Sequence, residues 1–150
     1  MQILLHLPQK LVSMYLIFKK ERDEEFYEAC KKAAKELIEK GVFITTIPVI
    51  KKAIMTPASS YFLDERNIAN IIRSKELPKS EAKTELYIQI KKEYSDLLIN
   101  LPFIKPETAA KLYISGYTAP RFYISIPRAI NIYYDEYKRR HSKSYYQTKK

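Results

Sequence analysis

The sequence predicts an all-α fold: two tandem, diverged three-helix units of helix-turn-helix type that share one compact body and end in a basic C-terminal tail. Three observations support this prediction. Apolar residues recur at helical spacing, and 46% of the 150 residues are hydrophobic while only two are glycine, too few for a turn-rich β fold. The third observation is an internal repeat with a period of about sixty residues.

The internal repeat has two anchors. An apolar stripe at residues 26–38 returns at 86–98 after a shift of 60, and the segment 57–66 returns at 119–128 after a shift of 61 to 62. Identity between the copies is low, but both keep the order of long helix, short helix, aromatic turn and third helix. A repeat at this period is typical of a duplicated supersecondary unit. The expected division is an apolar N-terminal segment packed on the body (1–22), a first unit (23–76), a second unit (80–140) and a basic, tyrosine-rich tail (141–150).

The first unit has local signals for the starts and ends of its helices. Acidic residues at 23–25 suit the positive end of a helix dipole, Gly41 suits the position just after a helix end, and Asp64 is a favoured N-cap. Apolar residues at helical spacing fill the stretches between these signals. The expected helices are Leu11–Phe18, Asp23–Lys40, Pro48–Met55 and Asp64–Ser74.

The second unit repeats these signals. Ser80 and Ser125 are candidate N-caps, and Pro106 is a residue favoured in the first turn of a helix. Residues 61–63 and 122–124 are aromatic and β-leaning, so short strands are an alternative there, although each segment is brief and lacks a partner strand. The expected helices are Glu81–Ile99, Pro106–Gly116 and Ser125–Arg140.

The N-terminal apolar residues and the single cysteine bear on the cellular setting. Residues 3–5 and 11–18 are apolar, but neither stretch approaches the ~20 residues that span a bilayer, and no cleavage-site pattern of a secretory signal follows. Cys30 lies on the apolar stripe and has no second cysteine to pair with, so we expect a buried thiol in a reducing compartment. These observations favour a soluble protein that is cytoplasmic during synthesis and makes no membrane contact.

The residues that usually carry chemistry are scattered along the chain. His6 and His141 lie far apart, no group of His, Cys or Asp has the spacing of metal ligands, and the two glycines do not form a phosphate-binding loop. Acidic residues occur in short runs that suit helix starts, such as 23–25 and 64–65. We therefore expect neither enzymatic activity nor a metal or other cofactor.

The positive charge is concentrated near the C-terminus. Residues 1–100 carry 17 basic and 14 acidic side chains, whereas residues 101–150 carry 10 and 3, with tyrosines interleaved among them. A basic, aromatic segment is typical of contact with a polyanion or an acidic protein face, while a merely solubilising tail is the alternative. The candidate residues for binding nucleic acid or a protein partner are Arg121, Arg128, Asn131, Lys138, Arg139, Arg140, Lys143, Tyr145, Tyr146, Lys149 and Lys150.

The third helix of each unit offers polar residues that could read DNA. Arg66 and Asn70 in the first unit match Arg128 and Asn131 in the second. Arginine pairs with guanine and asparagine with adenine in the major groove, and lysine or arginine holds phosphates. Any amphipathic helix also presents polar residues to solvent, so an ordinary solvated face is the alternative.

Two short segments carry a family resemblance. Residues 118–125, followed by Arg128 and Ala129, resemble a motif in small uncharacterised proteins of bacteriophages and mobile elements of gut Bacteroidetes. The segment 57–62 is similar to a companion version of that motif, except that Ser60 stands where an arginine is expected. The resemblance implies a phage origin, and it implies no activity and no site residues.

Two hypotheses for function follow. The first is a non-catalytic small structural or adaptor protein of a phage-type particle, located in the virion. It would dock on larger protein subunits, as an oligomer within the assembly, and on packaged nucleic acid through its basic, tyrosine-rich second half. The alternative is a DNA-binding protein with a duplicated helix-turn-helix, of a regulatory or packaging kind, in which Arg128 and Asn131 read bases.

Overall fold

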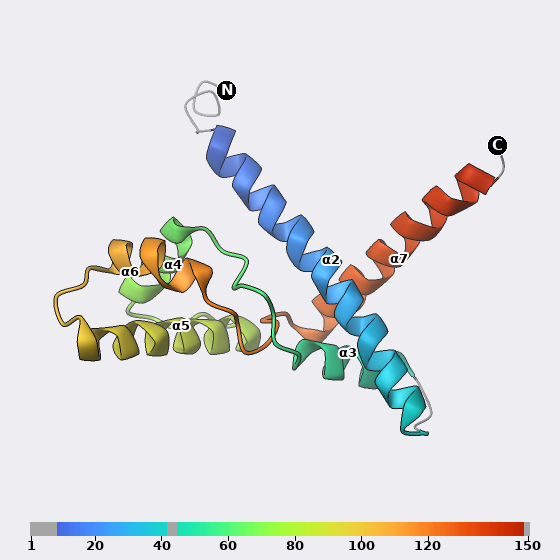
Figure 1. Cartoon of the computed structure of the whole chain (residues 1–150), viewed down its shortest axis with the longest axis horizontal. Coiled ribbons are helices and arrows are strands. Elements are labelled where there is room, and N and C mark those ends of the chain that lie inside the picture. Colours follow the sequence, from blue (N-terminus) through green and yellow to red (C-terminus); the bar gives the residue numbers. More distant parts are fainter. Residues whose placement is uncertain (1–8, 42–44, 149–150) are drawn as a thin grey trace. The chain divides into compact units, whose positions relative to one another are not determined.

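The computed structural model describes residues 9–41 and 45–148 (Figure 1). The prediction of an all-α fold is confirmed, because the described residues form helices and connections and contain no strand. Residues 61–63 and 122–124, the two alternative strands, are irregular connections. The elements are α2 (Gln9–Glu39), α3 (Thr46–Ile54), α4 (Glu65–Arg73), α5 (Glu81–Asn100), α6 (Pro106–Leu112), the 3₁₀ helix η1 (Ile114–Gly116) and α7 (Ile126–Thr148).

Two helices are longer than the sequence predicts. The expected separate helix at 11–18 is wrong, because α2 runs without a break from Gln9 to Glu39. Its residues 19–22 are Lys, Lys, Glu and Arg, all good helix formers, so nothing interrupts the backbone there. The expected end near Arg140 is also wrong, since α7 continues to Thr148. No proline or glycine follows Pro127, so the residues assigned to a tail extend the helix instead.

Most of the predicted helix ends are confirmed. The side chain of Asp64 accepts a 2.7 Å hydrogen bond from the backbone N–H of Asn67, and Gly41 takes the left-handed conformation, φ 75°, after α2. Ser125 accepts a 3.3 Å bond from the N–H of Arg128. Ser80 occupies the N-cap position of α5 but makes no side-chain cap bond. Its carbonyl instead accepts from the Thr84 hydroxyl at 2.8 Å.

The described helices group into two compact units. Unit 1 contains residues 59–119, with α4, α5, α6 and η1, together with the part of α2 before Arg22. Unit 2 contains residues 22–58 and 120–150, with the rest of α2, α3 and α7. Each unit therefore combines a long and a short helix from one half of the chain with the third helix of the other half. The order of the chain alone would keep all three helices of each half together.

The core of unit 1 is small and aliphatic. Ile68, Ile90 and Ile114 are fully buried and come from α4, α5 and η1, while Ala109 and Ala110 let α6 approach α4 closely. The hydroxyl of Tyr61 donates to the Glu93 carboxylate at 3.2 Å, which ties the start of the unit to α5. The helices of unit 1 are thus held by tight packing around isoleucine side chains.

The core of unit 2 is more aromatic. Phe26 of α2 and Phe122 meet edge to face with ring centres 5.3 Å apart, and both are buried. The N–H of Phe122 donates to the carbonyl of Ile54 at 2.9 Å, which joins the end of α3 to the segment before α7. The predicted burial of Cys30 is confirmed, and burial raises the pKa of its thiol to about 12. This thiol therefore stays protonated at neutral pH.

Candidate functional site

The candidate binding residues of the sequence lie on α7 or next to it. Arg128, Asn131 and Lys138 are exposed on α7. Their spacing of three and seven residues places them on one side of the helix. The side chains of Lys143, Tyr145 and Tyr146 are not among those described, although their backbone belongs to α7. Lys149 and Lys150 lie outside the described residues.

Arg139 and Arg140 are engaged within unit 2. The guanidinium of Arg139 lies 2.6 Å from the Glu136 carboxylate and 3.7 Å from that of Glu24. Arg140 lies 2.7 Å from Glu28 and 3.6 Å from Glu136. The hydrogen bond from Arg140 lowers the pKa of the Glu28 carboxyl. Acidic residues of α2 therefore balance part of the basic cluster that the sequence assigns to an external partner.

A ladder of aromatic rings runs along α7. Tyr133 stacks on Tyr27 of α2 with ring centres 5.4 Å apart and on Tyr137 at 6.4 Å, and Tyr137 stacks on His141 at 3.8 Å. The guanidinium of Arg140 lies 4.3 Å from the Tyr27 ring centre, a cation–π contact. Burial, followed by the proximity of Tyr27, raises the pKa of the Tyr133 phenol. Tyr133 thus packs α7 onto α2, and Tyr137 and His141 continue the stack along α7.

Arg121 has a local role in the segment before α7. Its Nε donates to the carbonyl of Phe122 at 3.3 Å, and its guanidinium lies 5.4 Å from the ring centre of Tyr123. The residue is half-buried. These contacts hold the connection that leads into α7, so Arg121 contributes to the fold of unit 2.

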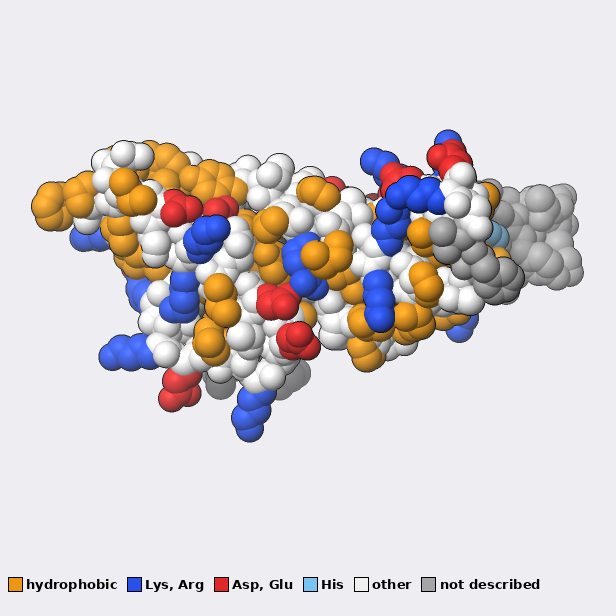
Figure 2. Space-filling view, turned by 90° about the horizontal axis from the view of Figure 1, so that it is seen from below, with side chains coloured by type: hydrophobic (Ala, Val, Ile, Leu, Met, Phe, Trp, Pro, Cys, Tyr) orange, Lys and Arg blue, Asp and Glu red, His pale blue; other side chains and the backbone are white. Residues whose placement is uncertain are grey.

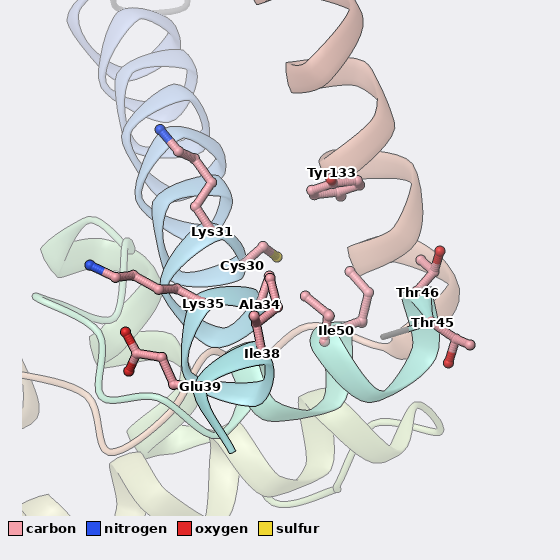
Figure 3. A pocket seen from close by; sticks show the side chains of 11 residues that line it. Cys30, Lys31, Ala34, Lys35, Ile38, Glu39, Thr45, Thr46, Ile50 and Tyr133 are labelled. Atoms are coloured by element: carbon pink, nitrogen blue, oxygen red, sulfur yellow. The ribbon is translucent and has the colours of Figure 1, made fainter. Parts of the chain in front are cut away.

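A groove of about 670 Å³ opens on unit 2 between α2, α3 and α7 (Figure 3). Cys30 and Ala34 point from α2 toward Ile50 of α3 and Tyr133 of α7 in this view. Val49 adds to the apolar lining. The volume of the groove falls in the range of sites that bind small molecules, roughly 300–1,000 Å³. The sequence gives no direct signal for this groove.

The rim of the groove is polar. The hydroxyl residues Thr45 and Thr46 lie on the α3 side. On the α2 side the stems of Lys31 and Lys35 line the rim and their ammonium groups extend outward, with Glu39 nearby (Figure 3). The groove therefore has an apolar floor, hydroxyls on its α3 side, and two lysines and one glutamate on its α2 side, which suits a ligand that is apolar at its centre and polar at its edge.

The place in unit 1 that corresponds to Ala34 holds a large side chain. Tyr94 occupies the position in the second copy of the repeat that corresponds to Ala34 in the first, 60 residues earlier. The hydroxyl of Tyr94 donates to the carbonyl of Ile104 at 2.7 Å. Tyr94 thus bridges α5 and the connection to α6. Lys91, which corresponds to Lys31, donates to the carbonyl of Ile72 at 3.3 Å and to that of Ser74. In unit 1 these two side chains tie α5 to the neighbouring segments.

Unit 1 exposes large apolar side chains at the end of α5, in the connection to α6 and at the end of α6. Phe103, Ile99 and Leu112 are 94%, 77% and 66% exposed, and Leu101 lies between the first two along the chain. We call these four residues the apolar end. Figure 2 shows hydrophobic side chains gathered at the left of the view, the side on which α5 ends in Figure 1. Sequence reasoning missed this surface, although Phe103 lies between two predicted helices and belongs to neither apolar stripe.

A hollow of about 520 Å³ in unit 1 shares Leu101 with the apolar end. Its lining also includes Glu93 and Asp96 of α5 and Tyr117. Burial, followed by the negative charge of Glu93, raises the pKa of the Tyr117 phenol. The hollow beside Leu101 therefore carries two carboxylates, whereas Lys105 and Lys111 lie close to Phe103 and Leu112 along the chain.

Three further findings concern the whole described part of the chain. Residues 9–41 and 45–148 contain no cluster of three or more His, Cys, Asp or Glu side chains placed to hold a metal ion. Among the same residues, no helix has the length and apolar character needed to cross a membrane. Comparison of the chain with models of protein families, with curated proteins and with solved structures finds no match.

Proposed function

We propose that the chain is a non-catalytic structural or adaptor protein of a phage-type particle, which docks on larger protein subunits. The observation that carries this proposal is the apolar end of unit 1. Phe103 and Ile99 expose most of their surface to water. Exposed clusters of large apolar side chains mark protein interaction sites, because contact with a partner removes that surface from water.

The motif resemblance of residues 57–62 and 118–125 supports the phage-type setting. A partner that covers the apolar end would contact side chains from both α5 and α6. Glu93 and Asp96, which line the hollow beside Leu101, would favour a basic residue on the part of that partner that enters the hollow. Contact with packaged nucleic acid is a further part of the proposal, carried by the exposed Arg128 and Lys138 on α7.

To test this proposal, residues of the apolar end are mutated in the genome that encodes the protein. The number of copies of the protein per purified particle is then measured by quantitative mass spectrometry. We expect the double variant Ile99→Ser, Phe103→Ser to lower the copy number per particle at least tenfold. The control is Ile88→Ser, which removes an exposed isoleucine of the same helix outside the apolar end. Normal incorporation of the double variant would contradict the proposal.

The alternative is a DNA-binding protein, favoured by the exposure of Arg128 and Asn131 on one side of α7. If Arg128 contacts a base, Arg128→Ala should relax the sequence preference and weaken binding to the preferred DNA site by about 1–3 kcal/mol. Fluorescence anisotropy with duplex DNA at several salt concentrations measures this. Because Arg139 and Arg140 are paired with Glu136, Glu24 and Glu28, we rank this alternative second. Salt-sensitive, sequence-dependent binding near physiological ionic strength would reverse that ranking.

A further inference from the structure

The groove of unit 2 lies beside Ala34, whose counterpart at the repeat shift of 60 is the much larger side chain of Tyr94 in unit 1. Tyr94 lies on α5 at the position that Ala34 holds on α2, and it reaches across to the connection that precedes α6. The groove beside Ala34 is bounded by the equivalent elements: the long helix, the start of the short helix at Thr45 and Thr46, and the third helix at Tyr133. At the repeat shift of 60, unit 1 thus carries a phenol ring at the position where unit 2 carries Ala34 beside its groove.

We propose that the groove of unit 2 binds an aromatic side chain of a partner protein, carried on a segment with acidic residues beside it. The ring would take the place that Tyr94 takes in unit 1, against Ala34, Val49 and Ile50. Aromatic side chains that fill apolar pockets are the usual anchors of protein interfaces, since one ring buries a large area at a low cost in conformational entropy. This inference deepens the proposed docking function and adds a second surface, separate from the apolar end.

Charge selects the flanking residues of this segment. Lys31 and Lys35 stand on the α2 rim beside Glu39, and Lys31 also lies 3.6 Å from Glu28. The charge of unit 2 is nevertheless positive, because its residues include 15 basic and 8 acidic side chains against 9 and 8 for residues 59–119. A carboxylate next to the aromatic anchor would meet these ammonium groups, whereas a basic flank would be repelled. The hydroxyls of Thr45 and Thr46 can pair with a phenol or with the backbone of the bound segment.

To test this inference, a library of random 12-residue peptides, displayed on a carrier, is selected for binding to the purified full-length protein. We expect enrichment of sequences that carry Tyr or Phe with neighbouring Asp or Glu. The dissociation constant of a selected synthetic peptide is then measured by fluorescence anisotropy. Ala34→Tyr should raise it at least tenfold because the new ring occupies the groove, while Ser95→Tyr, which adds a tyrosine at an exposed position of α5, should leave it within twofold.

A pair of charge variants covers the case in which Ala34→Tyr does not fold. Lys35→Glu should weaken peptide binding threefold or more, whereas Lys32→Glu, on the same helix but outside the groove, should change it much less. Phe103→Ser should leave peptide binding intact. Loss of peptide binding therefore tests the groove, and loss of incorporation into particles tests the apolar end, so the two results are distinguishable. The inference is overturned if no such peptides are enriched or if binding survives both groove variants.

Discussion

Units 1 and 2 combine the same three kinds of helix but finish their packing differently. In unit 1 the hydroxyl of Tyr94 bonds to Ile104, and Lys91 bonds to carbonyls at the end of α4. In unit 2 the corresponding residues are Ala34, which leaves an open groove, and Lys31, which pairs with Glu28 on its own helix at 3.6 Å. One unit is thus completed by its own side chains, and the other keeps an opening.

The third helices show the same contrast. α4 ends at Arg73, and Lys91 holds the carbonyls that this end leaves without helical partners. α7 continues to Thr148 and packs on α2 through Tyr133, which stacks on Tyr27, and through Arg140, which pairs with Glu28. The third helix of unit 1 is thus held at its end by a lysine of the long helix, whereas that of unit 2 is held along its side by rings and an ion pair.

The largest effect is expected from exchanging the side chains at the two corresponding positions. Tyr94→Ala should lower the free energy of unfolding by about 3 kcal/mol, because it removes a packed ring and a hydrogen bond to a backbone carbonyl. Ala34→Tyr should change it by less than about 1 kcal/mol, because the groove has room for the ring. Urea unfolding followed by circular dichroism measures both. Equal losses in the two variants would mean that the positions are not alike in their surroundings.

A smaller effect is expected from the ring ladder. Tyr133→Ala removes the ring that stacks on both Tyr27 and Tyr137, and it should cost about 2 kcal/mol. Tyr134→Ala, next to it but exposed, should cost less than about 1 kcal/mol. Thermal unfolding of the two variants compares them directly. If Tyr134→Ala is the more damaging variant, the ladder does not hold α7 to α2.

The sequence carries enough information for the helices but not for their grouping. Periodic apolar residues and local caps such as Asp64 and Gly41 act over a few neighbours, so these elements could be predicted. The exchange of third helices depends on packing between segments far apart in the chain. The engagement of Arg140 by Glu28 likewise joins residues 112 positions apart. The duplication itself stays a prediction.

The candidate site was only partly visible in the sequence. The exposure of Arg128, Asn131 and Lys138 follows from their spacing on a helix. The groove could not be predicted from α2 alone, because it also needs Ile50 and Tyr133 from two other helices. One signal for it was present: Ala34 and Tyr94 occupy matching positions of the repeat and differ strongly in size.

The smallest expected effect concerns pH. The bond from Arg140 lowers the pKa of Glu28 in the folded protein, so the unfolded chain binds the proton more readily. The stabilisation is present above the ordinary carboxyl pKa of 4.5 and is lost as the pH falls through the lower, folded value. Glu28→Gln should therefore reduce stability at pH 7 more than at pH 3, as measured by chemical unfolding. A loss that is equal at both pH values would show that the ion pair contributes nothing.

The correspondence between the filled place in unit 1 and the groove in unit 2 is tested most directly by a crystal structure of the Ala34→Tyr variant. We expect the new ring to lie in the groove against Ile50, as Tyr94 lies between α5 and the connection to α6, with the helices of unit 2 unmoved. A ring turned out into solvent beside an unchanged groove, or helices pushed apart to admit it, would contradict the account.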